Sequence, residues 1–291
     1  MKHLLSFPLL GLLWCLHFLP LPWLRALGAG LGRLLFRFGR ERRQVALTNL
    51  ALCFPHMSEV DREQLARRHF IVFAQALLDR TLVWWASRRR LEALIDIRGA
   101  EHLSDPAGRP IIMLSPHFVG LDAGAIRISM RVPGCSIYSR QKNPVFDRLV
   151  YNGRRRFSDV LLLSRQDGLR KIIKAMREGR RFYYLPDMDF GPDDSIFVPF
   201  FGVPAATIPA LSRLVRLTGA RVVPCISRLT AQGYVLEVLP SWDNFPGDSI
   251  EADTLRMNRF IESQVLTMPE QYFWLHKRFK TRPPGEQRFY P

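Results

Sequence analysis

A histidine and an acid separated by four residues stand out in the stretch SPHFVGLD, residues 115–122. Histidine can remove a proton near neutral pH, and a carboxylate bonded to its other ring nitrogen fixes the tautomer and stabilises the imidazolium. On one regular helix His117 and Asp122 point roughly 140° apart, so they can meet only across a bend. Pro116 and Gly120 suit a turn from a strand into a helix. The pair is therefore either a general base with its orienting acid or a buried histidine beside a helix-start carboxylate.

Two further acids, Asp187 and Asp189, follow the strand-like run FYYLP and share one side of an extended segment. Such a pair could bind a metal, orient a polar ligand or cap a helix. A metal is the least favoured of the three, because only Asp193 and Asp194 recur nearby, in a segment typical of a turn.

Three consecutive arginines, Arg154 to Arg156, lie in YNGRRRF, and Arg140 precedes them. Consecutive residues of a helix point in different directions, so at most one or two of the three can face a single site. A member that faces the site can hold phosphate through two parallel hydrogen bonds. Otherwise these residues form a solvated basic face.

The N-terminal residues 4–24 carry no fixed charge, and a helix of that length matches the roughly 30 Å apolar core of a bilayer. Prolines at 8, 20 and 22 interrupt such a helix, so a helix that lies partly embedded is the alternative, and a cleaved signal peptide is a third. Arginines follow the apolar run, and only Lys2 precedes it. This asymmetry favours residues 1–24 as a membrane anchor whose C-terminal side is cytoplasmic.

Residues 25–57 form a second predicted segment, basic on one face and apolar on the other. Arg33, Arg37 and Arg40 recur at helical spacing between leucines and phenylalanines. A helix of this kind suits the surface of an anionic leaflet. The competing interpretation, a basic helix that binds RNA, leaves the preceding apolar segment unexplained.

The remaining residues, 58–291, are predicted to form one domain. It begins with a long amphipathic helix capped by Ser58, and short apolar runs then alternate with helical patterns. This alternation predicts an α/β fold with a mixed, largely parallel sheet covered by helices. The expected strands are 110–115, 135–138, 159–163, 181–185, 221–226 and 234–239, and the expected helices are 120–131, 144–156, 167–178, 207–218 and 250–267. In such sheets the functional residues follow the carboxyl ends of strands.

The composition narrows the range of partners. Lys and Arg total 42 against 26 Asp and Glu, a formal net charge of +16, and most of the basic residues are arginine. Arginine favours anionic head groups, nucleic acid or an acidic protein. The four cysteines are far apart and include no CxxC pair, which argues against a zinc site or disulfide framework and fits a reducing compartment.

Taken together, the motifs resemble the late acyltransferases of lipid A biosynthesis, the lauroyl and myristoyl transferase family, which is itself related to glycerolipid acyltransferases with an H-x4-D/E motif. The matching blocks, in family order, are NLALCFP (49–55), PHFVGLD (116–122), YSRQKNPVFDRL (138–149), NGRRRF (152–157), YLPDMDFGPDDSIFVPFFGVPAAT (184–207) and QYFWLHKRFKTRP (271–283).

The resemblance implies roles for five residues. His117 and Asp122 correspond to the catalytic dyad, Arg154 to the essential arginine of the family, and Asp187 and Asp189 to the acids of its PDQD motif. We add Arg140 as a candidate substrate contact. Two departures stand out: a methionine occupies position 188 where the family typically has glutamine, and the acid of the dyad is Asp where several members carry Glu.

The resemblance also implies an activity. We expect an inner-membrane enzyme, with its active site facing the cytoplasm, that moves a fatty acyl group from acyl carrier protein to a hydroxyl of a hydroxyacyl chain on a lipid A precursor. The donor chain is carried on phosphopantetheine, and no other cofactor and no metal is implied. The expected partners are the carrier protein, the lipid precursor and anionic membrane lipids, without nucleic acid. The alternatives are a glycerolipid or lysophospholipid acyltransferase with the same dyad, and a membrane-tethered, non-enzymatic nucleic-acid-binding protein.

Overall fold

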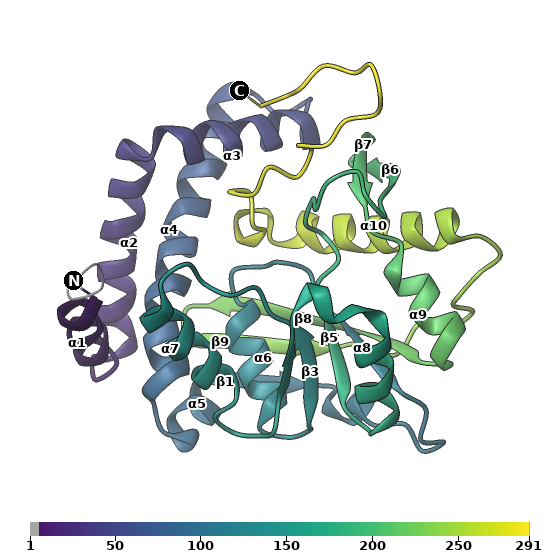
Figure 1. The fold of residues 1–291 in the computed structure, drawn as a ribbon. Coiled ribbons are helices and arrows are strands. Elements are labelled where there is room, and N and C mark those ends of the chain that lie inside the picture. The colour runs from purple at the N-terminus through teal and green to yellow at the C-terminus, as the bar shows by residue number, and fades with distance from the viewer. Residues whose placement is uncertain (1–5, 291) are drawn as a thin grey trace.

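A seven-stranded sheet forms the centre of the computed structural model, which describes residues 6–290 (Figure 1). The strand order is β1-β9-β8-β2-β5-β3-β4, and neighbouring strands run parallel except for β8 and β9. This confirms the predicted mixed, largely parallel sheet. The strands are β1 (Ile95–Arg98), β2 (Ile111–Leu114), β3 (Gly134–Ile137), β4 (Leu161–Leu163), β5 (Arg181–Tyr184), β8 (Arg221–Thr230) and β9 (Gly233–Val238).

Both faces of the sheet are buried, which explains why its central strands read as unbroken apolar runs. In β2, Ile112 and Leu114 join one core cluster, whereas Ile111 and Met113 join another on the opposite face. Helices α8, α9 and α10 add side chains to the first cluster, and α6 adds Ile128 to the second. The sheet is therefore a rigid layer between helices, and its edges are left to carry the loops.

The helices after the first strand follow the predicted pattern to within a few residues. They are α6 (Leu121–Ser129), α7 (Pro144–Arg154), α8 (Gly168–Arg177), α9 (Ala210–Thr218) and α10 (Ile250–Thr267), with 3-10 turns η1 (Ala100–Leu103), η2 (Arg165–Asp167) and η3 (Pro269–Gln271). A separate antiparallel hairpin of β6 (Ile196–Phe200) and β7 (Val203–Thr207) turns at Phe201 and Gly202, both with positive φ. Positive φ at both loop residues is the geometry of the tightest hairpins.

The N-terminal region is helical but differs from the prediction. It contains α1 (Ser6–Leu16), α2 (Leu21–Phe38), α3 (Arg40–Cys53), the long α4 (Glu59–Trp85) and the short α5 (Arg88–Leu94). The single anchor helix expected over residues 4–24 is wrong in its described part, because the chain turns between α1 and α2, where Pro20 precedes the second helix. Residues 4 and 5 lie outside the described range. Within residues 6–290, no helix is both long and apolar enough to cross a bilayer.

Helix α2 lies against α4 at very short range. A side-chain carbon at Gly28 would lie 2.7 Å from the Cα of Gln75, and one at Gly32 would lie 2.5 Å from the carbonyl oxygen of Phe70. Only glycine allows two helices to approach this closely. The boundary predicted at residue 24 falls inside α2, whereas α4 begins after the Ser58 cap, as predicted.

A buried ion pair adds a specific lock to this contact. Arg25 Nε lies 2.8 Å from an Asp79 oxygen that also accepts a 2.6 Å hydrogen bond from the Tyr234 hydroxyl. Arg25 is on α2, Asp79 on α4 and Tyr234 on β9. Because removing one partner of a buried pair leaves an uncompensated charge, this contact fixes α2 to the body of the protein.

Candidate active site

His117 and Asp187 are brought together by the register of two neighbouring strands. In the β2–β5 ladder, Leu114 is paired with Tyr184, and His117 and Asp187 each follow three residues later, after a proline. His117 Nδ1 lies 2.7 Å from one oxygen of Asp187, and the backbone N–H of His117 donates to the other oxygen at 2.9 Å. The carboxylate therefore fixes both the ring and the backbone of the histidine.

The environment of this pair favours an ionised acid beside a usable base. Burial opposes ionisation of Asp187, but the charge and hydrogen bonds of His117, together with the charge of Arg278, hold the pKa of Asp187 below its usual value. The carboxylate then accepts a hydrogen bond from the Nδ1–H group, which leaves the lone pair of the ring on Nε2. The acid is almost fully buried, whereas the His117 side chain is 22% exposed.

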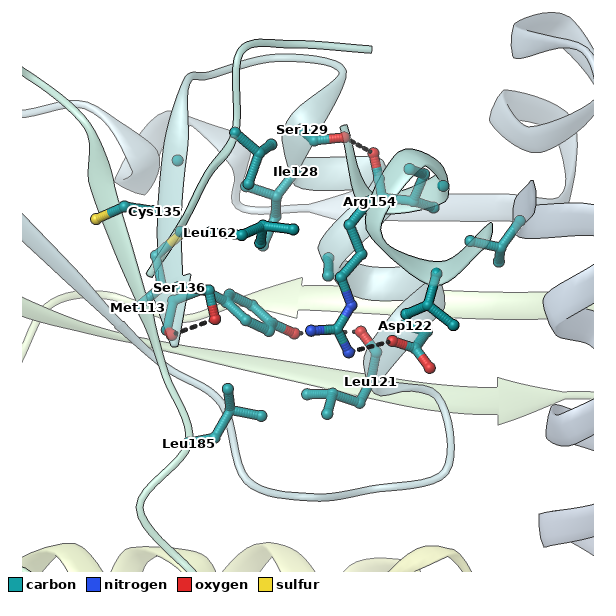
Figure 2. Close-up of a pocket in the computed structure, with 18 of the residues that line it drawn as sticks. Met113, Leu121, Asp122, Ile128, Ser129, Cys135, Ser136, Arg154, Leu162 and Leu185 are labelled. Carbon is teal, nitrogen blue, oxygen red and sulfur yellow. Dashed lines mark hydrogen bonds and ion pairs between the residues drawn. The ribbon is translucent and has the colours of Figure 1, made fainter. Parts of the chain in front are cut away.

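Asp122 belongs to a different polar group. Its carboxylate lies 2.7 Å from Arg80 of α4. It also lies 3.2 Å from Arg154 at the end of α7 (Figure 2). Burial opposes ionisation, but the two arginines lower the pKa of Asp122 to about 2. Among the contacts of the described residues, the expected hydrogen bond between His117 and Asp122 is not formed. Asp122 lies in the first turn of α6, which directs it toward α4 and α7, whereas His117 is directed toward β5.

The three consecutive arginines separate as helical geometry predicts. Arg154 reaches Asp122, Arg155 reaches Asp159, and Arg156 donates to backbone carbonyls at the end of α4. Arg140 is exposed on the loop after β3, at the same edge of the sheet. One of the three arginines therefore faces the site, and the others hold α7 in place.

Asp189 does not share the task of Asp187. Its oxygens accept hydrogen bonds from the Gly191 N–H at 2.9 Å, the Thr281 N–H at 2.6 Å and the Thr281 hydroxyl at 2.8 Å. Three donors from the chain itself occupy this carboxylate. In this structure Asp189 ties the loop after β5 to the C-terminal region, and its predicted substrate contact stays a prediction.

A C-terminal segment, residues 271–276, supports the histidine loop from above the sheet edge. Phe273 N–H donates to the carbonyl of His117 at 2.9 Å, and His276 Nε2 accepts from the Asp189 N–H at 2.8 Å. Burial, together with the charges of Arg278 and His117, lowers the pKa of His276 to about 4. A neutral ring is what this acceptor role requires. We call residues 271–276 the C-terminal strap.

Asn49 on α3 holds the strap in turn. Its side-chain amide donates to the carbonyl of Trp274 at 2.7 Å and to that of His276 at 2.8 Å, and its oxygen accepts from the Tyr290 hydroxyl. Asn49 is 1% exposed. Its role was missed by the sequence reasoning, although a buried asparagine on the apolar side of a helix must find hydrogen-bond partners.

Two cavities meet at this edge of the sheet. The first, about 440 Å³, is lined by His117 and by residues of β5, α8 and α9. The second, about 190 Å³, is lined mainly by carbon-rich side chains of α6, β3, β4 and β5, with Arg80, Asp122 and Arg154 among them (Figure 2). Tyr183 and Leu185 line both cavities. We call them the His117 cavity and the apolar cavity.

Two hydroxyl groups in the wall of the apolar cavity are engaged by backbone carbonyls. The hydroxyl of Ser129 donates to the carbonyl of Ile126, and that of Ser136 donates to the carbonyl of Tyr183. Met113, Ile128 and other aliphatic side chains line much of the rest, and the charged side chains of Arg80, Asp122 and Arg154 also line the cavity. The cavity therefore suits a hydrocarbon chain better than a polar ligand. Among residues 6–290, no group of three or more histidines, cysteines or acids is placed to hold a metal ion.

His117, oriented by a buried acid, lines a cavity that shares two residues with the apolar cavity. General-base chemistry on a lipid needs groups of these kinds. The family model described as bacterial lipid A biosynthesis acyltransferase matches residues 2–281, so the chain belongs to this family of acyltransferases.

Three similar proteins from Escherichia coli (strain K12) agree with this assignment. The chain is 38% identical to lipid A biosynthesis lauroyltransferase over 95% of this chain and 91% of the relative. It is 36% identical to lipid A biosynthesis myristoyltransferase over 89% and 81% of the two chains. It is 32% identical to lipid A biosynthesis palmitoleoyltransferase over 97% and 92%.

Proposed function

We propose that this protein transfers a fatty acyl chain from acyl carrier protein to a hydroxyl of a hydroxyacyl chain on a lipid A precursor. The family supports the reaction class and the lipid. The observation that carries the chemistry is the 2.7 Å contact between His117 Nδ1 and Asp187, which leaves Nε2 of a partly exposed ring beside a cavity of about 440 Å³.

In the proposed reaction, Nε2 of His117 takes the proton of the acceptor hydroxyl as its oxygen attacks the thioester carbonyl. The bond from carbon to sulfur then breaks, and the phosphopantetheine thiol leaves with the proton returned by the imidazolium. Asp187 takes the orienting part that the sequence assigned to Asp122, and it stabilises the charged ring. The acyl group arrives already activated as a thioester on the carrier. The protein therefore supplies only the base, the group that orients it and the binding surfaces.

The apolar cavity is the proposed site for the acyl tail. Tyr183 and Leu185 line both this cavity and the His117 cavity, which supports a placement of the acyl tail here with its thioester end toward the histidine. Asp122 holds Arg154 at this cavity, and we propose that it acts through that arginine. The charge there is net positive, because two arginines, Arg80 and Arg154, face one carboxylate, Asp122. A positive charge suits the anionic end of a lipid.

We also propose that α1 and α2 bring the enzyme to the cytoplasmic face of the inner membrane. Large apolar side chains are exposed along α2, including Trp23 at 70% and Phe38 at 71%, and Arg33 and Arg37 are exposed on the same helix. Further exposed apolar side chains lie on α1 and in the turn after it: Phe7, Leu9, Leu12, Trp14 and Phe18. Aromatic and basic residues together are the usual composition of a surface that binds anionic lipid.

The test is an assay of the purified protein with acyl carrier protein thioesters and two acceptors, a lipid A precursor and a lysophospholipid, read by mass spectrometry. We expect the acyl group on the hydroxyacyl chain of the lipid A precursor. Transfer to the lysophospholipid alone would replace this proposal with the glycerolipid alternative. Salt-sensitive RNA binding without any acyl transfer would favour the non-enzymatic alternative.

A further inference from the structure

Helices α8 and α9 present a strongly basic surface that the proposed chemistry does not use. The two helices, Gly168–Arg177 and Ala210–Thr218, contain six basic residues and no acidic residue. All six are exposed: Arg170, Lys171, Lys174, Arg177, Arg213 and Arg216. In Figure 1 these helices lie side by side on the flank opposite to α1 and α2. We call this surface the basic face.

Part of the basic face is free to bind an anion. On α8, Arg170, Lys174 and Arg177 follow the i, i+4, i+7 spacing that places them in one stripe. Lys174 has Glu178 at 3.9 Å. Among the described residues, no hydrogen bond or ion pair engages the guanidinium groups of Arg170, Arg177 or Arg213. The guanidinium groups of these three arginines therefore stabilise no other part of the described structure.

The basic face begins at the rim of the His117 cavity. Leu169 and Ile172 of α8 and Arg213 of α9 line the same cavity as His117. A partner bound to these helices is therefore placed where a flexible arm can enter the cavity and reach the histidine. Arg213 is the basic residue of α9 that lines this cavity.

We infer that the basic face is the docking surface for the acidic carrier protein that delivers the acyl thioester; this rests on the proposed function. Charge complementarity is the argument, since an acidic helical surface meets a stripe of cations with no intervening carboxylate on either helix. A lipid bilayer is a poorer fit, because the most exposed aromatic side chains, Phe7, Trp23 and Phe38, lie on α1 and α2. Electrostatic docking speeds association and weakens as salt is added.

The experiment compares two donors in two double variants. Arg170→Glu/Arg177→Glu reverses the α8 stripe, and Arg89→Glu/Arg131→Glu makes the same change of charge at exposed arginines near the other end of the strands. The donors are the acyl carrier protein thioester and the acyl thioester of N-acetylcysteamine, which has neither carrier nor phosphate. For Arg170→Glu/Arg177→Glu we expect KM for the carrier thioester to rise roughly tenfold or more, with kcat/KM for the small thioester within about twofold of wild type. The control variant should leave both unchanged.

An unchanged carrier KM in the α8 variant, or an equal rise in the control, overturns the docking surface. A raised KM for the lipid A precursor in place of the carrier also overturns it and assigns the basic face to the acceptor. Failure of the proposed function looks different, because the wild-type protein would then transfer acyl groups from neither donor. An arm test is available through Arg213→Gln, which should raise KM for acyl-phosphopantetheine more than for acyl-pantetheine; equal effects would remove the phosphate contact.

Discussion

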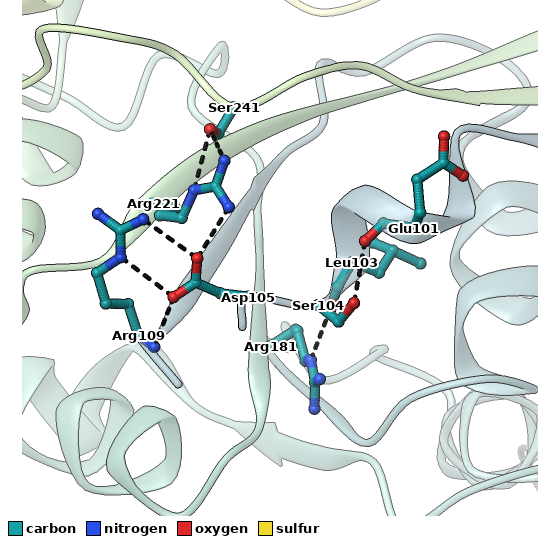
Figure 3. A network of polar contacts seen from close by, with 8 residues as sticks. All are labelled: Glu101, Leu103, Ser104, Asp105, Arg109, Arg181, Arg221 and Ser241. Atoms are coloured by element: carbon teal, nitrogen blue, oxygen red, sulfur yellow. Dashed lines mark hydrogen bonds and ion pairs between the residues drawn. The ribbon is translucent and has the colours of Figure 1, made fainter. Parts of the chain in front are cut away.

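Two carboxylates, Asp122 and Asp105, are each held between two arginines, at opposite ends of the sheet. Asp122 has Arg80 and Arg154 at the edge where the parallel strands end. Asp105 precedes β2 at the edge where they begin, and its oxygens lie 3.1 Å from Arg109 Nε and 2.9 Å from an Arg221 nitrogen (Figure 3). Both have lowered pKa values, with hydrogen bonding from Arg109 as the main cause for Asp105.

The difference between the two groups lies in what surrounds them. The Asp105 group is closed, because the backbone N–H of Arg109 adds a third donor and Arg221 donates to the hydroxyl of Ser241 (Figure 3). The Asp122 group lines a cavity. The same kind of aspartate–arginine group is therefore structural at one edge of the sheet and lines a ligand-sized cavity at the other. In α/β proteins the edge at which parallel strands end carries function, and these two aspartates show that position decides more than charge does.

The largest expected effect comes from removing the base at the edge where the strands end. His117→Ala should lower kcat by about 10³- to 10⁴-fold, because no other group takes the acceptor proton. Steady-state acyl transfer measures the loss, and thermal unfolding checks the fold. Near wild-type turnover in a folded variant would remove His117 from the mechanism.

A smaller loss, roughly 10²-fold, is expected for Asp187→Asn. The amide keeps the shape of the contact but lacks the charge that stabilises the imidazolium. Asp189→Asn serves as the matched control two residues away, since its donors come from the loop and Thr281. If both variants lost activity equally, Asp187 would have no special relation to the histidine.

Substitution of each of the two aspartates tests whether the two edges of the sheet differ in function. Asp122→Asn should lower kcat/KM roughly tenfold, because Arg154 loses the partner that positions it at the apolar cavity. Asp105→Asn should change kcat/KM by less than about twofold while lowering the thermal midpoint by a few degrees. Equal effects on activity would show that the two edges of the sheet do not differ as the cavity suggests.

The last prediction concerns stability and not the rate of the reaction. Burial lowers the pKa of both His276 and His69 to about 4, from a usual value of 6.5. Between these values the unfolded chain binds protons that the folded chain refuses, so stability falls as pH drops from 6.5 to 4. The slope is roughly 1.4 kcal/mol per pH unit for each histidine. Denaturant unfolding across this range measures it, and His276→Gln should reduce the slope.

The pH effect also separates the two ends of the sheet. His276 belongs to the C-terminal strap, and His69 Nδ1 lies 2.9 Å from the carbonyl of Glu270, just before that segment. The pKa of Asp105 lies below 3.8, so that group does not titrate between pH 4 and 6.5. Asp105→Asn should therefore leave the slope unchanged, and a changed slope would contradict the separation.

Much of the fold was predictable because its strands are short apolar runs buried on both faces, and its helices alternate with them. The turn from strand to helix after His117 also followed from Pro116 and Gly120. The identity of the acid beside the histidine did not, because it depends on strand order. Asp187 is 70 residues away in sequence and becomes a neighbour only because β5 lies next to β2. The proline that precedes each residue, at the same distance from its strand, was the available signal.

Other parts of the site had no comparable local pattern. Asn49 reaches the strap through hydrogen bonds across more than two hundred residues, and no spacing rule links them. The prediction of one membrane helix over residues 4–24 was based on the length of the apolar run and on the charges around it. Pro20 and the glycines of α2 instead divide it and pack the second part on α4.

The lock between Arg25 and Asp79 has a mechanical consequence. A helix on a flexible linker leaves an enzyme free to tumble above the lipid to which it is tied. Here α2 moves with α4 as one solid piece, so any lipid surface that holds Trp23 and Phe38 also sets the height and tilt of His117 above it. Under the proposed membrane binding, the enzyme would meet its lipid substrate by diffusion in two dimensions, with its active site held in a fixed orientation.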